Sequence, residues 1–77
     1  MNLKSLEVFY WVVKLGSFNK AAAKQNTTQP AVSQRISALE AELGIKALHR
    51  STRAIALTAK GRALFDYAER LVMLQSE

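Results

Sequence analysis

The chain has 77 residues, of which 49% are hydrophobic, and it carries a formal net charge of +5. A chain of this length supports one domain, and so small a domain buries only about 60% of its unfolded surface, which makes a lone monomer marginally stable. The absence of cysteine excludes disulfide frameworks, thiol chemistry and zinc sites with sulfur ligands. The single histidine, His49, lies in a basic segment without a nucleophile or carboxylate nearby in sequence, so we expect neither an enzyme nor a cofactor.

The positive charge is concentrated in the middle of the chain. Residues 14–62 contain nine basic side chains and two acidic ones, whereas the two ends are mildly acidic. This distribution is expected of a nucleic-acid-binding face, although an ordinary basic surface on a small protein would give the same pattern.

The longest apolar run near the N-terminus covers residues 8–13, far fewer than the ~20 residues that a membrane span needs. The first four residues do not begin an export signal. We therefore expect a soluble, cytoplasmic protein with no membrane partner.

Two helices are predicted in the first 25 residues. Apolar side chains recur at helical spacing over residues 3–15, and Gly16 follows as an end signal. Ser17 is the expected N-cap of a second, short, alanine-rich helix that stops near Gln25. Residues 26–28 then have side chains that bond back to the backbone in turns and caps, which predicts a tight turn.

Residues 28–43 predict a third helix with two different faces. Its buried stripe is formed by apolar residues at i, i+4, i+7 and i+11, namely Val32, Ile36, Leu39 and Leu43. The opposite face has short polar or small side chains: Pro30, Ala31, Ser33, Gln34, Ser37 and Ala41. Thr28 is the expected N-cap and Gly44 the expected end, so the positive end of the helix dipole lies beside a face that a polyanion can approach. In most helices such a face is simply solvated. This helix alone is therefore a weak signal for nucleic-acid binding, and the neighbouring elements of the chain must support it.

A short helix, a tight turn and a longer amphipathic helix make the helix-turn-helix arrangement that places its second helix in the major groove of DNA. The following residues 48–57 alternate as a short β-hairpin does, with residues 51–52 near its tip, and a hairpin in this position is a wing. Arg50 and Arg53 flank the tip, where they can meet phosphates or enter the minor groove. Alternatively, Arg50 ties the wing to Glu40 or Glu42 at the end of the third helix.

The last predicted helix begins after Thr58 and runs to residue 77, about 28 Å. It has more apolar surface than one small domain can cover, so we expect a symmetric homodimer through this helix. The predicted dimer contacts are Leu64, Phe65, Ala68, Leu71 and Val72. The alternative function from the residues is a helical protein-protein interaction module that uses the exposed apolar face of residues 59–77. RNA binding is a weaker alternative, because the aromatic side chains lie on apolar stripes rather than free for stacking.

An ordered series of motifs resembles the N-terminal domain of LysR-type transcriptional regulators over nearly the whole chain. The motifs are Gly16-Ser17-Phe18, Ala21-Ala22, residues 28–33, Ile36, Leu39-Glu40, Leu43-Gly44, Arg50, Arg53, Leu57-Thr58 and Gly61. The sequence departs from the family pattern in having Ala47-Leu48 where Leu-Phe is usual, which predicts lighter packing of the wing, and in having Gln25 at a usual Leu position. Gln34-Arg35 also replaces a frequent Arg-Gln order.

The resemblance implies a mainly α, winged helix-turn-helix fold with a three-helix core, a short two-stranded wing and a long C-terminal linker helix. It divides the chain into a DNA-binding domain, residues 1–58, and a linker and dimerisation helix, residues 59–77. The residues predicted to contact DNA are Thr28, Gln29, Pro30, Ala31, Ser33, Gln34, Arg35, Ser37, Arg50 and Arg53. The expected partners are a double-stranded DNA operator of pseudo-palindromic sequence and a second copy of the chain, with a tetramer possible in a full-length protein. A co-inducer would bind only to a C-terminal domain that is absent from these 77 residues.

Overall fold

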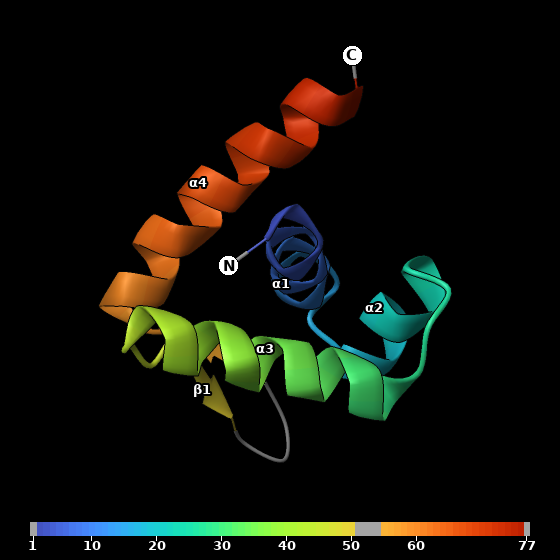
Figure 1. Ribbon diagram of the computed structural model, residues 1–77, viewed down its shortest axis with the longest axis horizontal. Helices are drawn as coiled ribbons and strands as arrows, with labels where there is room; N and C mark the ends of the chain where they lie inside the picture. Colours follow the sequence, from blue (N-terminus) through green and yellow to red (C-terminus); the bar gives the residue numbers. More distant parts are fainter. Residues whose placement is uncertain (1, 51–54, 77) are drawn as a thin grey trace.

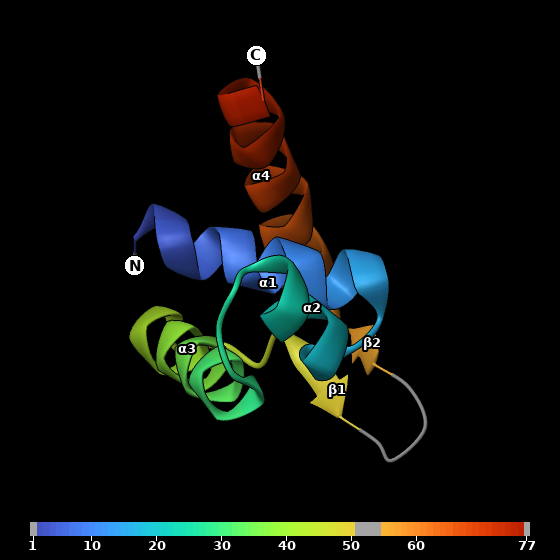
Figure 2. The ribbon, with the colours of Figure 1, turned by 90° about the vertical axis from the view of Figure 1, so that its right-hand side faces the viewer.

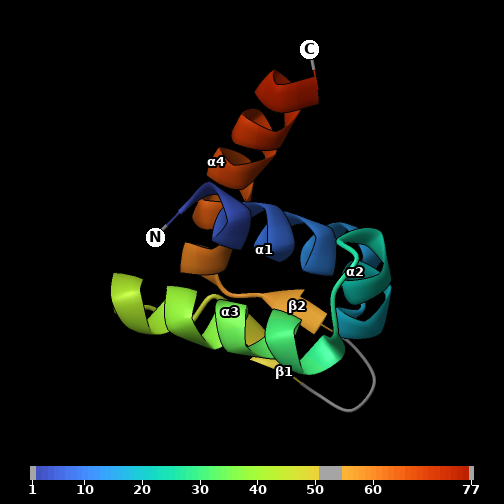
Figure 3. The same ribbon diagram turned by 45° about the vertical axis from the view of Figure 1, so that its right-hand side comes forward.

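The helices and strands follow the order predicted from the sequence. The computed structural model describes residues 2–50 and 55–76. Its elements are α1 (Leu3–Leu15), α2 (Phe18–Lys24), α3 (Gln29–Leu43), β1 (Leu48–Arg50), β2 (Ile55–Leu57) and α4 (Ala59–Ser76). Helix α1 lies between α3 and α4 (Figure 3), and α4 rises away from the other helices toward the C-terminus (Figure 1). The mainly α, winged helix-turn-helix class is confirmed.

The helix boundaries come from local capping chemistry that the sequence displays. The side chain of Ser17 accepts a hydrogen bond from the backbone N–H of Lys20, and this caps α2. Helices α1 and α3 end at Gly16 and Gly44, which have φ values of 68° and 66° in the left-handed region that glycine tolerates best. In the turn between α2 and α3, Asn26 also adopts a positive φ of 55°, which asparagine accepts more readily than most residues.

The core is built around α1, which buries one face against α3 and another against α4. The predicted stripe of α3 is confirmed: Val32, Ile36 and Leu39 are buried, and Leu43 packs partly against them. From the other side, the ring of Phe65 on α4 stacks on that of Tyr10 with their centroids 5.5 Å apart.

Three of the five predicted dimer contacts prove to be core residues of the single chain. Phe65, Ala68 and Val72 are only 9%, 0% and 8% exposed, because the face of α4 that carries them packs on α1. Leu64 and Leu71 are half-buried against the same core. A side chain covered within its own chain has little area left for a partner, so these three residues serve the core first, and their part in a dimer contact stays a prediction.

The apolar surface that α4 leaves open lies elsewhere on the helix. Tyr67 and Met73 are each 50% exposed, and Leu74 is 66% exposed. These three residues are called the open face of α4 below.

The two strands pair antiparallel, with Leu48 opposite Leu57 and Arg50 opposite Ile55. Figure 2 shows the strands below α1, on the side opposite the free end of α4. Ala47 and Leu48 are completely buried, so the smaller side chains at this place are fully enclosed, and the lighter packing of the wing stays a prediction.

Helix α4 packs closely against the base of the wing, next to the small residue Ala47. A Cβ atom added to Gly61 would lie 1.9 Å from the carbonyl oxygen of Ala47, so the first turn of α4 rests directly on the backbone that leads into β1. The backbone N–H of Thr58 donates to the same carbonyl at 3.1 Å, and the Thr58 hydroxyl donates to the carbonyl of Lys46. Thr58 thus joins α4 to the wing and also caps α4 by accepting from the N–H of Gly61 at 2.9 Å.

Candidate nucleic-acid interface

The predicted reading residues of α3 lie together on its outer face and first turns. Side chains at the following positions are exposed: Thr28, Gln29, Pro30, Gln34, Arg35 and Ser37. Ala31 and Ser33 are half-buried at the edges of this face. Because the buried stripe holds the other side of the helix against α1, the polar side is presented outward, and we call these eight residues the reading face.

The start of α3 is held by a cap that the sequence predicted. The Thr28 hydroxyl accepts a hydrogen bond from the N–H of Ala31 at 3.3 Å, and Pro30 occupies the first turn, where a missing N–H leaves no helical bond unmade. No acidic side chain stands in the first turn of α3, so nothing there opposes the positive end of the helix dipole. This end of the helix is suited to approach a phosphate backbone.

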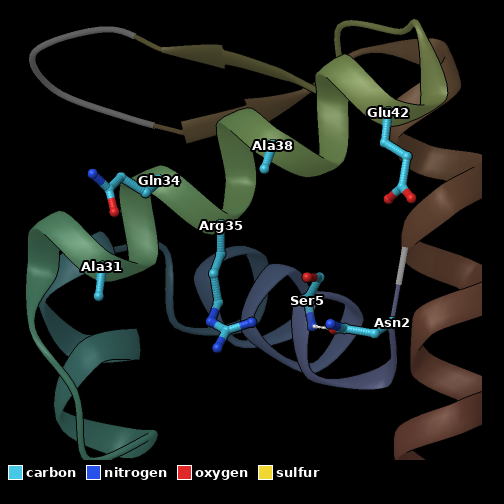
Figure 4. A pocket seen from close by; sticks show the side chains of 7 residues that line it. All are labelled: Asn2, Ser5, Ala31, Gln34, Arg35, Ala38 and Glu42. Atoms are coloured by element: carbon cyan, nitrogen blue, oxygen red, sulfur yellow. Dashed lines mark hydrogen bonds between the residues drawn. The ribbon is translucent and has the colours of Figure 1, made fainter.

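A hollow of about 550 Å³ adjoins the reading face. It lies between the start of α1 and the side of α3, and its lining residues are Asn2, Ser5, Ala31, Gln34, Arg35, Ala38 and Glu42. Figure 4 shows Arg35 extending into this space toward the first turn of α1, while Gln34 points away from α1. Gln34 is therefore placed on the central part of the reading face, and Arg35 at its edge.

The turn before α3 is tied to α1 by two cationic side chains. The Lys4 ammonium donates to the side-chain oxygen of Gln25 at 2.9 Å, so the polar residue that departs from the family pattern has a partner. The Lys24 ammonium lies 4.5 Å from the ring centroid of Trp11, a cation–π contact that the sequence does not reveal. Both contacts fix the end of α2 relative to α1 and so help to orient the helix that follows.

The wing is attached to α3 through the carboxylate of Glu40. Its Oε2 accepts hydrogen bonds from the backbone N–H groups of Ala47 at 2.8 Å and Leu48 at 3.2 Å, and its Oε1 lies 3.7 Å from Nη2 of Arg50. The Arg50 guanidinium also sits 5.1 Å from the ring centroid of Phe18. The alternative in which Arg50 ties the wing to α3 is thus the contact that the structure contains.

Arg53 and the predicted tip at residues 51–52 lie outside the described residues. The prediction that Arg53 serves the wing stays a prediction. Within residues 2–50 and 55–76, no helix is long and apolar enough to cross a membrane.

A short helix, a tight turn, a second helix with an exposed polar face and an adjoining two-stranded hairpin define the class of winged helix-turn-helix domains. Residues 3–62 match the family model described as "Bacterial regulatory helix-turn-helix protein, lysR family", and the chain belongs to this family.

Relatives agree with the family match over almost the whole chain. An HTH-type transcriptional regulator in the ibpB-leuC intergenic region of Azotobacter vinelandii is 44% identical over 94% of this chain and 50% of its own length. The HTH-type transcriptional activator AaeR of Escherichia coli strain K12 is 43% identical over 91% of this chain and 23% of its own length. The chain thus spans about half of one relative and less than a quarter of the other.

A solved structure has the same fold. The BenM DNA-binding domain in its complex with catB site 1 DNA superposes with a TM-score of 0.92 at 39% identity, covering 99% of this chain and 84% of that one. The winged arrangement described above is therefore one found in a domain captured on DNA.

Proposed function

We propose that this chain is the part of a LysR-type transcriptional regulator that binds double-stranded operator DNA in a sequence-specific way. Helix α3 enters the major groove, and the wing lies at the adjacent backbone or minor groove. The observation that carries the proposal is the reading face, a polar surface held outward by a buried apolar stripe on the second helix of a helix-turn-helix. The likeness to a domain captured on DNA supports it.

The side chains on the reading face divide into base contacts and backbone contacts. Gln29 and Gln34 carry the amide that bonds bidentately to adenine, and the small apolar groups of Pro30 and Ala31 suit a thymine methyl. Ser33 can bond a base edge or a phosphate. At the groove edge, Arg35, Ser37 and the cap residue Thr28 are placed for the sugar-phosphate backbone.

We also propose that the active form is a homodimer joined through the open face of α4. In this division of the chain, residues 1–58 read DNA and residues 59–77 form the linker and dimerisation helix. The exposure of Tyr67, Met73 and Leu74 supports this, because three large apolar side chains in water favour a covering partner. A symmetric dimer would place two copies of α3 in successive major grooves about 34 Å apart and would read a pseudo-palindrome. In a full-length regulator two such dimers can form a tetramer, and a co-inducer would bind to a different domain.

The proposed function requires no catalytic group and no cofactor of these residues. As the reading part of a bacterial regulator, the chain would act in the cytoplasm, which contains the chromosome.

Substitution of Gln34 tests the proposal directly. Affinity is measured at fixed salt for a duplex selected from random DNA with this chain and for a scrambled duplex of equal length. Gln34→Ala should cost about 1–3 kcal/mol on the selected duplex and little on the scrambled one, because an amide-adenine pair contributes only where the base is correct. The matched control is Gln75→Ala, which removes the same side chain from an exposed position on α4.

Equal losses on both duplexes would show that Gln34 supports binding without reading sequence. If the unaltered chain fails to prefer any duplex, sequence-specific DNA binding itself is refuted.

A further inference from the structure

We propose that Glu40 and Arg50 are positioning residues that hold the wing at a set angle to α3, and that Arg50 supports DNA binding through Glu40 and not as a phosphate ligand. The inference rests on the proposed function, because it concerns how the wing is presented to DNA. It reassigns Arg50, which the sequence placed among the residues that contact DNA.

The first support is the number of bonds that converge on one carboxylate. Glu40 is in the last turns of α3, and its two oxygens meet the N–H groups of Ala47 and Leu48 and the guanidinium of Arg50. Its side chain is only 11% exposed. A carboxylate so enclosed needs these donors, since burial without partners costs a charged group several kcal/mol.

The backbone of α3 directs the wing back toward this same residue. The N–H of Ile45 donates to the carbonyl of Glu40 at 3.1 Å, while Gly44 reverses the chain in the left-handed conformation. Glu40 therefore holds the connection at two points, through its backbone carbonyl at Ile45 and through its carboxylate at the start of β1. The direction in which β1 leaves α3 depends on both.

The second support is the environment of the Arg50 guanidinium. It lies at the end of β1, with Nη2 3.7 Å from Glu40 on α3 and Cζ 5.1 Å from the ring centroid of Phe18, the first residue of α2. One side chain thus links the wing to both helices of the helix-turn-helix. Its side chain is 34% exposed, so part of it is engaged by contacts within the chain.

The sign of the change in DNA affinity on removal of the Glu40 charge distinguishes a positioning role from simple repulsion of phosphates. Removing a negative charge near the interface should strengthen DNA binding if the carboxylate acts only by repelling phosphates. Removing it should weaken binding if the carboxylate holds the wing in place. Glu40→Gln therefore gives opposite results under the two accounts.

The test compares Glu40→Gln with the unaltered chain. Affinity for the selected duplex is measured over a range of salt concentrations, and circular dichroism verifies that each variant is folded at the assay temperature. We expect Glu40→Gln to bind about tenfold more weakly than the unaltered chain. The glutamine oxygen can still accept from Ala47 and Leu48, so the variant removes the pairing of the carboxylate with Arg50 and keeps the bonds at the start of β1.

The salt dependence of DNA binding by Arg50→Gln distinguishes a positioning residue from a phosphate ligand. A phosphate ligand contributes about 0.9 to the slope of log affinity against log salt, so its loss from both halves of a dimer lowers the slope by about 2. We expect the affinity to fall while the slope stays unchanged. We also expect the double variant Glu40→Gln/Arg50→Gln to bind no more weakly than the weaker single variant, because the two residues act as one unit.

Two results would overturn the inference while leaving the proposed function intact. One is Glu40→Gln binding as tightly as the unaltered chain or more tightly, and the other is a flatter salt slope for Arg50→Gln. If Glu40→Gln is unfolded, the slope of Arg50→Gln decides alone. If the unaltered chain does not discriminate between duplexes, the proposed function is refuted and the inference with it.

Discussion

Replacing Gly61 by alanine tests whether the junction of α4 with the wing is as close as the structure has it. The added Cβ would lie 1.9 Å from the Ala47 carbonyl oxygen, whereas such contacts essentially never fall below 3.0 Å, so the two backbones must separate by about 1 Å. Such overpacking costs about 1–3 kcal/mol. Separation also weakens the hydrogen bond from the Thr58 N–H to the Ala47 carbonyl, for a further ~1 kcal/mol.

Helix propensity acts in the opposite direction. Alanine is favoured over glycine inside a helix by about 1 kcal/mol. The net expectation for Gly61→Ala is a loss of about 2 kcal/mol in the free energy of unfolding, which lowers the melting temperature of a domain this small by about 10 °C. The clash therefore decides the sign.

Thermal and urea denaturation followed by circular dichroism measure this loss at a constant protein concentration, since dimerisation would make the midpoint depend on concentration. The control is Ala63→Gly, at an exposed position in the same helix, which should lose about 1 kcal/mol through propensity alone. Propensity predicts opposite signs for the two variants, whereas the close contact predicts that both are destabilised. A higher melting temperature for Gly61→Ala would refute the reasoning.

The two faces of α4 give two further predictions. Phe65→Ala removes a ring that is 9% exposed and stacked on Tyr10, so it should cost about 3–5 kcal/mol and leave the chain largely unfolded by circular dichroism; a stable, folded variant would mean that Phe65 is not part of the core. Leu74→Asp changes a side chain that is 66% exposed, so unfolding of the dilute monomer should shift by no more than ~0.5 kcal/mol while the dimer dissociates in sedimentation experiments. Dimerisation of equal strength in Leu74→Asp would exclude the open face of α4 as the dimer contact.

The parts of the fold that the sequence predicts are those set by local chemistry. Ser17 and Thr28 cap the helices that they were expected to cap, and Gly16 and Gly44 end the helices before them. Each of these signals depends on residues within one turn, so no knowledge of the tertiary structure is needed. The reading face was predictable from the sequence because a buried stripe of period 3.6 leaves only one side of α3 facing outward.

The parts that the sequence did not predict depend on contacts between distant elements. Apolar side chains surround α4, so the pattern cannot say which of Phe65 or Leu74 meets α1 and which is left open. Likewise, a glycine in the first turn of a helix gives no sign that another backbone lies against it, as Ala47 does against Gly61. The sequence left Arg50 either to DNA or to a carboxylate at the end of the third helix, and its contact with Glu40 depends on how the wing folds back on α3.

Selection of bound sequences from random duplex DNA tests the central claim most directly. If the reading face on α3 recognises bases and two copies act together, the selected sequences should share a dyad-symmetric consensus whose half-sites are about one helical turn apart. The absence of any enriched sequence at moderate salt would contradict the account and would favour a role in binding other proteins through α4.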